Sequence, residues 1–380
     1  MNVFIRADAS LQMGTGHVMR CMTLARALRQ LGITVSFVSR EIPGHLCDFV
    51  EDEGFAVCRL PYDGAMAMAM PERSDYARWL ETTPVQDAVE TGLAIAAANL
   101  PVDWLVVDHY TLDWNWERAM RRFTRNIMVI DDLANRHHDC ELLLDQNLYE
   151  NMKTRYDGRI PPHTVKLLGP EFALLRPDFS ELRRHARARK GEIKRILIFF
   201  GGCDLSNETS KAIEAVALNR RAEIMADVVI GANNPNREAI EAAAVRLPFV
   251  KCHFNVRNMA KLMVEADMCI GAAGGTTWER CCLGLPAMVV TVADNQVAAT
   301  RCMHEKDVLY FIGEHSRVSV KNIAEAIDLF CGKPDLVRRY SANSMSLVDG
   351  MGVQKCVDIM LNAGSTRKLE TIGDGDGEAI

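Results

Sequence analysis

The sequence predicts two doubly wound α/β domains, each built on a parallel sheet. Three observations carry this prediction. Short apolar runs alternate with helical patterns in the first half of the chain, the same alternation restarts near residue 195, and many of the runs end in glycine or polar residues. Buried parallel strands have this appearance when their carboxyl ends open onto a binding site.

The first half begins with a strand at residues 2–8 and a helix at 16–32, in which apolar residues recur every three or four positions. Further strands are expected at 34–40, 56–62, 104–110, 126–132 and 140–147. Residues 64–82, rich in methionine, alanine and polar side chains, fit no element. They form either a mobile lid beside a site or a surface excursion.

The second half repeats the pattern after a turn-rich, basic join at 150–195. Its strands are expected at 195–202, 226–232, 249–255, 267–275, 287–292 and 308–314. We therefore expect a first domain at 1–168 and a second at 192–343. A helix at 344–364 could cross back to the first domain, and residues 365–380 are expected to form a disordered tail.

Composition limits the classes of function. Hydrophobic residues make up 48% and charged residues 25% of the 380, and the formal net charge of −6 argues against nucleic acid as a partner. No apolar run approaches the roughly 20 residues that span a bilayer. The twelve cysteines contain no C-x-x-C pair, which favours free thiols in a reducing compartment. We expect a cytoplasmic monomer without a membrane span.

The first strand leads into a glycine-rich turn, Gly14-Thr15-Gly16, and then into His17 at the start of a helix. A dinucleotide fingerprint would need a third glycine, which is absent, so no nicotinamide or flavin cofactor is expected. The positive end of the helix disfavours a protonated imidazole and keeps a neutral base available. A histidine that only braces the turn is the equally weighted alternative.

The second half has a similar strand, glycine-rich turn and helix start at residues 271–286. A strand ends in small residues and is followed by Gly274, Gly275 and Thr276 at a helix start, where backbone N–H groups and a hydroxyl attract phosphate. Glu279, one turn later, could accept both hydroxyls of a ribose. Further polar groups come from Asn295 and Gln296 at another helix start and from a third glycine loop at 199–211.

Several acidic residues and histidines follow the strands of the first half. Each is about as likely to bind a sugar as to brace its loop, and the set comprises Asp8, Asp108, His109, Asp131 and Asp132. The pair His137-His138 suggests a metal site, but adjacent side chains of an extended chain point to opposite sides. A solvated loop is the favoured interpretation, and no metal is expected.

Taken together, several motifs in their order and spacing resemble a known family. The motifs are "RADASLQMGTGHVMRCMTLA", "VVDHY", "IDDLANRHHDCELLLDQN", "LLGPEFALLRPDF", "FFGGCDLSN", "GAAGGTTWE" and "DNQ". They resemble the UDP-2,4-diacetamido-2,4,6-trideoxy-β-L-altropyranose hydrolases of the pseudaminic acid pathway over most of residues 2–300. The resemblance implies a two-domain glycosyltransferase-B architecture, with the active site in the interdomain cleft and UDP held mainly by the second domain.

The resemblance also implies roles for particular residues. His17 matches the general base that activates water, and Tyr110 matches a catalytic tyrosine on the sugar side. The UDP-binding residues it implies, together with those of the phosphate loop, are Asn207, Gly274, Gly275, Thr276, Glu279, Asn295 and Gln296. On the side of the sugar we expect Arg6, Asp8, Gly14, Gly16, Arg20 and Asp108. The chain departs from the family at Cys203 and Ala273, where serine or threonine is common.

The expected reaction is hydrolysis of the anomeric C–O bond with inversion, because UDP is a good leaving group once its charge is absorbed. A glycosyltransferase of the same fold is the main rival, since the same loops would serve an acceptor alcohol. Two further possibilities are a UDP-sugar 2-epimerase and a non-catalytic nucleotide-sugar-binding protein.

Overall fold

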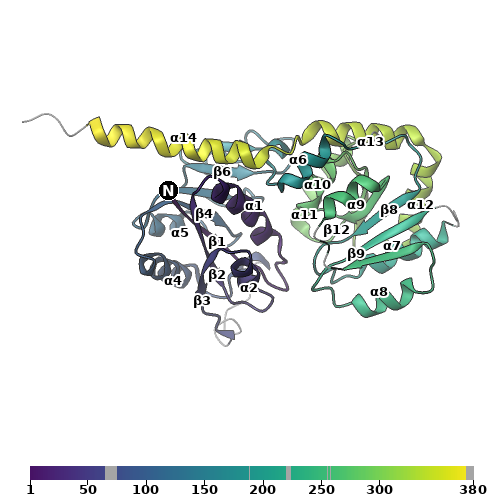
Figure 1. Cartoon of the computed structure of the whole chain (residues 1–380), viewed down its shortest axis with the longest axis horizontal. Helices are drawn as coiled ribbons and strands as arrows, with labels where there is room; N and C mark the ends of the chain where they lie inside the picture. Colours follow the sequence, from purple (N-terminus) through teal and green to yellow (C-terminus); the bar gives the residue numbers. More distant parts are fainter. Residues whose placement is uncertain (65–74, 188, 220–223, 255, 257, 374–380) are drawn as a thin grey trace, which may run out of the picture. The chain divides into compact units, whose positions relative to one another are not determined.

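The computed structural model describes residues 1–64, 75–187, 189–219, 224–254, 256 and 258–373. The chain divides into two compact units. Unit 1 comprises residues 1–146, 153–168 and 352–380, and unit 2 comprises 147–152 and 169–351. Each unit is a parallel sheet with helices on both faces (Figure 1), as the sequence predicts.

Unit 1 is built on a seven-stranded sheet in the order β3-β2-β1-β4-β5-β6-β7, and every neighbouring pair is parallel. Its strands are β1 (Asn2–Ala7), β2 (Thr34–Arg40), β3 (Ala56–Leu60), β4 (Val102–Asp108), β5 (Thr124–Ile130), β6 (Leu142–Asp145) and β7 (Val165–Leu168). Its helices are α1 (Gly16–Gln30), α2 (Cys47–Asp52), the 3₁₀ helix η1 (Asp75–Leu80), α4 (Pro84–Ala97), α5 (Trp114–Met120) and α14 (Gly352–Gly373).

Both faces of the unit 1 sheet are buried, which explains why its central strands are continuously apolar. Phe4 and Leu105 belong to a core that includes Ile95 of α4 and Trp116 of α5. Ile5, the next residue of β1, points to the opposite face of the sheet and is equally buried. Helix α1 contacts β1 and β2. Two layers of helices thus enclose the sheet, and the ends of the strands are left to carry polar side chains.

Unit 2 has a six-stranded parallel sheet in the order β10-β9-β8-β11-β12-β13. Its strands are β8 (Arg195–Phe199), β9 (Met225–Ile230), β10 (Val250–Phe254), β11 (Met268–Ala272), β12 (Ala287–Thr291) and β13 (Tyr310–Glu314). Its helices are η2 (Pro170–Phe172), α6 (Pro177–Arg183), α7 (Glu208–Leu218), α8 (Arg237–Ala244), α9 (Met259–Glu265), α10 (Thr276–Cys282), α11 (Asp294–Glu305), α12 (Val320–Gly332) and α13 (Pro334–Leu347).

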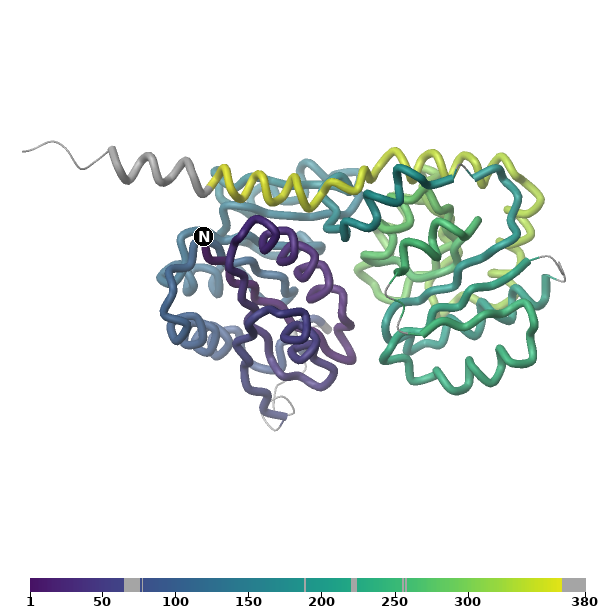
Figure 2. The backbone as a smooth tube through the Cα atoms, viewed as in Figure 1, coloured from purple at the N-terminus to yellow at the C-terminus, as the bar shows by residue number. Residues whose placement is uncertain are grey.

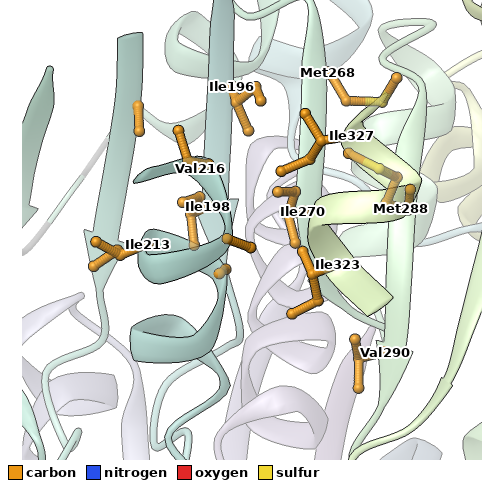
Figure 3. Packing of buried hydrophobic residues seen from close by; sticks show 14 of the residues in the cluster. Ile196, Ile198, Ile213, Val216, Met268, Ile270, Met288, Val290, Ile323 and Ile327 are labelled. Atoms are coloured by element: carbon orange, nitrogen blue, oxygen red, sulfur yellow. The ribbon is translucent and has the colours of Figure 1, made fainter. Parts of the chain in front are cut away.

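The core of unit 2 follows the two-residue period of its strands. Ile196 and Ile198 of β8 face Val216 of α7, and Ile270 of β11 lies close to Ile323 of α12 (Figure 3). The residues between them, such as Leu197, join a second core on the opposite face. Because both faces are apolar, ligands can meet this sheet only at its strand ends.

The structure differs from the expected elements in three places. The short strand β7 was not expected. The helix expected at 344–364 is interrupted, because Gly350 adopts φ of 82° between α13 and α14. Helix α14 packs along α1 within unit 1 (Figure 2) and continues to Gly373, beyond the predicted start of the tail at 365. Residues 65–74 and 374–380, which include parts of the expected lid and tail, lie outside the described residues.

Candidate active site and nucleotide-binding loops

In both units most candidate residues follow the strands at which the strand order reverses, whereas Asn295 and Gln296 follow β12. In unit 1 these are β1 and β4, where Ala7 pairs with Asp108. In unit 2 they are β8 and β11, which are also direct neighbours. Open α/β sheets bind ligands at the carboxyl ends of the strands on either side of such a switch point. The topology therefore singles out the same loops as the motifs.

The glycines that precede His17 leave room above the chain. Gly14 adopts φ of 77° and pairs with Ser10 in an isolated bridge, so the loop after β1 folds back sharply. A Cβ atom built on Gly14 or Gly16 would meet nothing within 4 Å. Thr15 stands at the N-cap of α1, and its side chain makes no capping bond. The loop thus brings its backbone to an open surface at the first turn of α1.

His17 is held by a buried carboxylate. Its Nδ1 lies 2.6 Å from Oδ1 of Asp108, at the end of β4. Burial raises the pKa of Asp108, but Arg20 and His17 outweigh it and hold that pKa well below its usual range. The ionised carboxylate accepts a hydrogen bond from Nδ1 and leaves Nε2 with its lone pair. This is the tautomer that a general base requires.

Arg20, one turn further along α1, ties two strand ends together. Its Nε and Nη2 donate to both oxygens of Asp108 at 2.6 and 2.7 Å, and its Nη1 donates to Asp132 at 2.8 Å. Its guanidinium is therefore engaged by two carboxylates. In this structure Arg20 holds Asp108, which in turn contacts His17. The direct contact of Arg20 with the substrate that the resemblance suggests stays a prediction.

Tyr110 lies against the imidazole of His17. The two rings meet edge to face with centroids 4.6 Å apart, and the Tyr110 hydroxyl donates to Asp132 at 2.6 Å. Burial, with Asp132 nearby, raises the pKa of Tyr110 well above its ordinary value. The hydroxyl therefore stays protonated and acts as a donor.

The described end of the 64–82 segment places two aromatic side chains, Tyr76 and Trp79, beside Tyr110. The sequence pattern did not predict this contact. In η1, Trp79 stacks on Tyr110 with centroids 5.4 Å apart, and Tyr76 meets the same ring edge to face at 5.3 Å. Trp79 also lies 6.2 Å from the His17 ring. A signal for it exists in the sequence, because "DYARWL" places two aromatic residues three positions apart.

Three residues expected on the sugar side are fully buried in this structure. Arg6, Asp8 and Asp108 each have 0% exposure. Arg6 donates to Asp8 at 2.6 Å and to Asp87 at 2.6 Å, and Asp108 serves His17. All three side chains are buried within the unit, and their direct contact with a sugar stays a prediction. Asp8 and Arg6 brace the end of β1.

In unit 2 the loop after β11 forms an open platform. Gly274 and Gly275 are exposed, and Gly274 adopts φ of 145°, a conformation that other residues rarely adopt. Thr276 follows at the first position of α10. The side-chain nitrogen of Gln296 would lie 4.0 Å from a Cβ atom built on Gly274. Gln296 is itself held by Val292, whose N–H donates to Oε1 at 3.0 Å.

Glu279 and Asn295 lie one turn into α10 and at the first turn of α11. Burial raises the pKa of Glu279 to about 7, with Arg176 opposing this shift and Asp178 reinforcing it. Hydroxyl groups that donated to the carboxylate would favour its ionised form and lower this pKa.

The third glycine loop, after β8, differs from a phosphate site. Asp204 accepts the N–H groups of Glu208 and Thr209 at 2.9 and 3.0 Å, so a carboxylate already occupies the start of α7. Asn207 adopts a left-handed φ of 55°, and its Oδ1 accepts a bond from Ser210 at 2.8 Å. The loop can offer Asn207 to a ligand but disfavours an anion at the helix start.

The histidine pair separates as expected, although only one of its members is solvated. His137 is exposed, whereas His138 is buried and its Nδ1 lies 2.7 Å from Glu117. Attraction to Glu117 and Asp131 outweighs burial and raises the pKa of His138 to about 9. Within the described part of the chain, no group of three or more histidine, cysteine or acidic side chains could hold a metal ion. No helix among the described residues is long and apolar enough to cross a membrane.

The fold and the site loops together define a glycosyltransferase-B architecture. Solved structures of that class superpose over almost the whole chain. MurG of Acinetobacter baumannii matches with a TM-score of 0.64 at 15% identity and covers 95% of this chain and 99% of its own. UDP-GlcNAc 2-epimerase of Neisseria meningitidis, bound to UDP-GlcNAc, matches with a TM-score of 0.58 at 13% identity and covers 95% and 100%.

Three sequence relatives indicate which proteins of this architecture the chain is similar to. A UDP-2,4-diacetamido-2,4,6-trideoxy-β-L-altropyranose hydrolase of Campylobacter jejuni is 24% identical over 313 residues, 80% of this chain and 97% of the relative. The spore coat polysaccharide biosynthesis protein SpsG of Bacillus subtilis is 21% identical over 367 residues, 95% and 98%. An uncharacterized protein of Methanocaldococcus jannaschii is 24% identical over 76% of this chain, which spans 55% of that protein's length. No family model matches the chain. The chain is thus similar to proteins that process nucleotide sugars.

Proposed function

We propose that the protein hydrolyses a UDP-linked 2,4-diacetamido-2,4,6-trideoxyhexose at the anomeric C–O bond with inversion. The products are UDP and the free sugar, which would feed the biosynthesis of pseudaminic acid. The observation that carries the proposal is the 2.6 Å contact between Nδ1 of His17 and Asp108 at the switch point of unit 1. The hydrolase of Campylobacter jejuni among the relatives supports the choice of substrate.

In the proposed mechanism Nε2 of His17 takes a proton from water as the water oxygen attacks the anomeric carbon. The bond from that carbon to the diphosphate oxygen breaks, and UDP departs with the electron pair. Asp108 stays ionised and stabilises the imidazolium ion that forms. Arg20 holds Asp108 in place through two hydrogen bonds of 2.6 and 2.7 Å. General-base catalysis of this kind contributes about 10²–10⁴-fold to the rate.

Unit 2 would hold the nucleotide. Gly274 and Gly275 allow the diphosphate to approach the backbone, and Glu279 would accept the ribose hydroxyls. Gln296, beside Gly274, would donate to the diphosphate or the sugar. Bound UDP needs little protonation to leave, because fixed dipoles absorb its charge.

Replacing His17 tests the assignment. His17→Ala is expected to lower kcat by about 10²–10⁴-fold while the Kd for UDP, measured by calorimetry, stays unchanged. His137→Ala, a change at an exposed histidine of the same unit, serves as the control and should keep full activity. Turnover by His17→Ala within a few-fold of the parent would refute the base assignment.

A glycosyltransferase is the second candidate, and the structural neighbours favour it, since MurG and a spinosyn rhamnosyltransferase share the fold. The same base would then deprotonate an acceptor hydroxyl. Release of UDP from the nucleotide sugar in buffer without any acceptor distinguishes the two, because only the hydrolase proceeds at its full rate. A non-catalytic binding protein would release no UDP under either condition.

A further inference from the structure

A buried cation contacts both ends of the loop that carries the exposed glycines of unit 2. Arg280 of α10 is 1% exposed. Its Nη2 donates to the carbonyl oxygen of Ala272 at 3.0 Å and to the Thr277 hydroxyl at 2.9 Å, and its Nη1 lies 3.9 Å from the sulfur of Cys269. These partners are all uncharged oxygen or sulfur atoms. Nε of Arg280 is buried without a hydrogen-bond partner.

Among the described residues, three other arginines with little exposure have carboxylate partners, whereas Arg189, like Arg280, does not. Arg6 and Arg40 both lie within 2.7 Å of Asp87, and Arg20 lies 2.6 Å from Asp108. In the part of the chain that the structure describes, no carboxylate oxygen forms an ion pair with the Arg280 guanidinium, whose partners are the three named above. A buried charge without a counter-ion is costly, so an arginine in this position calls for an explanation.

The position of the charge indicates what would balance it. Ala272 and Thr277, to which the guanidinium is bound, flank the segment that carries the two exposed glycines. Burial raises the pKa of Glu279 to about 7, so this neighbouring carboxyl is incompletely ionised at neutral pH and offsets the cation only in part. An anion resting on Gly274 and Gly275 would be attracted by the guanidinium, because the protein between them screens charge less than water does.

We propose that Arg280 is the positioning charge for the diphosphate of the nucleotide. It attracts the anion through the glycine platform without touching it and fixes the conformation of residues 272–277 by its two hydrogen bonds. The inference rests on the proposed function, because it assigns the platform to the diphosphate of UDP. It predicts that unit 2 discriminates in favour of a nucleoside diphosphate over the neutral nucleoside.

The test compares UDP with uridine as ligands of the full-length protein. Arg280→Met is expected to weaken UDP binding roughly tenfold and to leave uridine binding unchanged. Arg280→Lys, which keeps the charge, should restore UDP binding to within about threefold of the parent. A purely structural role would weaken both ligands alike, and lysine would not rescue the preference.

Arg189 provides a matched control. It is also buried, and its guanidinium donates to the carbonyl oxygens of Arg187, Met263 and Leu283. Arg189→Met should lower stability and leave the ratio of the UDP and uridine affinities at the parental value. If Arg280→Met does not fold, the ratio of UDP to uridine affinities is compared between Arg280→Gln and Arg280→Lys. This comparison also shows whether the charge at position 280 sets the preference for UDP.

The outcomes separate the two proposals. An unchanged UDP-to-uridine ratio in the neutral variants overturns the role of Arg280 and leaves the proposed function intact. Failure of the parent protein to bind UDP at all overturns the proposed function, and the role of Arg280 falls with it.

Discussion

Asp108 accepts a hydrogen bond of 2.6 Å from Nδ1 of His17, although the two residues are 91 positions apart. The contact exists because β1 and β4 are neighbours at the switch point of the sheet, which brings the end of β4 beneath the first turn of α1. The carboxylate has no exposure to solvent. Its effect is to fix the tautomer of a histidine that lies at the first turn of the helix.

Replacing this carboxylate should disable the base while leaving it in place. In Asp108→Asn the new amide donates to Nδ1, so the proton moves to Nε2 and the base is lost. We expect kcat to fall by about 10³–10⁴-fold. Steady-state kinetics at saturating substrate checks this.

Asp87→Asn is the control for the loss of a buried carboxylate. Asp87 is also fully buried and accepts bonds from Arg6 and Arg40, but it does not contact His17. Thermal unfolding should show that both variants are destabilised, by about 3–5 kcal/mol if a buried pair is broken. Equal losses of kcat in the two variants, assayed below their unfolding temperatures, would contradict the tautomer account.

Glu279 should make nucleotide binding depend on pH. Burial raises its pKa to about 7, so the carboxylate that accepts ribose hydroxyls is present above pH 7 and is lost as the pH falls. UDP affinity is expected to rise by roughly tenfold from pH 6 to pH 8. Isothermal titration calorimetry over this range measures it.

Glu279→Gln isolates this contribution, because the phosphates of UDP titrate in the same range. In the variant only the ionisation of the ligand, near pH 6, should remain. The 2′-deoxy nucleotide should show a weaker dependence in the parent protein, since it lacks one hydroxyl. Identical pH profiles for the parent and Glu279→Gln would argue against the ribose contact.

The same carboxyl should reduce stability at high pH. Its pKa is raised from 4.5 to about 7 in the folded protein, so the folded state binds more protons than the unfolded state between these values. Stability is therefore lost as the pH rises through this window. Glu279→Gln should be more stable than the parent by ~1–3 kcal/mol at pH 8 and similar to it at pH 4. Urea unfolding at both pH values tests the difference, and a variant less stable at pH 8 would contradict it.

Trp79 should contribute to binding of the sugar. Its ring stacks on Tyr110 at 5.4 Å and flanks His17. Trp79→Ala is expected to raise KM for the nucleotide sugar by about 3–10-fold and to leave the Kd for UDP alone unchanged. Trp114→Ala, a change at an exposed tryptophan of α5, is the control. A loss of UDP affinity in Trp79→Ala equal to the change in KM would place its effect on the nucleotide instead.

Much of the fold could be predicted because buried parallel strands are nearly all apolar, as in Leu105 to Val107 of β4. Strand β7 could not be predicted because it has four residues, lies at the edge of the sheet beside β6 and exposes Val165 and Lys166. The break between α13 and α14 at Gly350 could not be predicted, because the sequence does not show which φ angle an isolated glycine adopts.

The positions of the candidate loops could be predicted, but the partners of their charged side chains could not. Gly14, Gly274 and the start of each helix follow from local patterns. The burial of Arg6 could not be predicted, since its partner Asp87 lies 81 positions away. Likewise, Asp204 follows two glycines in the manner of a ligand-binding residue, yet its carboxylate caps its own helix. Such pairings are fixed by tertiary structure.

Turnover of the UDP-linked 2,4-diacetamido sugar in ¹⁸O-labelled water tests the central claim most directly. Mass spectrometry of the released UDP is the decisive measurement, because its phosphate oxygens do not exchange with water, unlike the anomeric hydroxyl of the free sugar. If water attacks carbon under the control of His17, the UDP carries no label and the freshly formed sugar does. Heavy oxygen in the UDP would mean attack at phosphorus and would contradict the account.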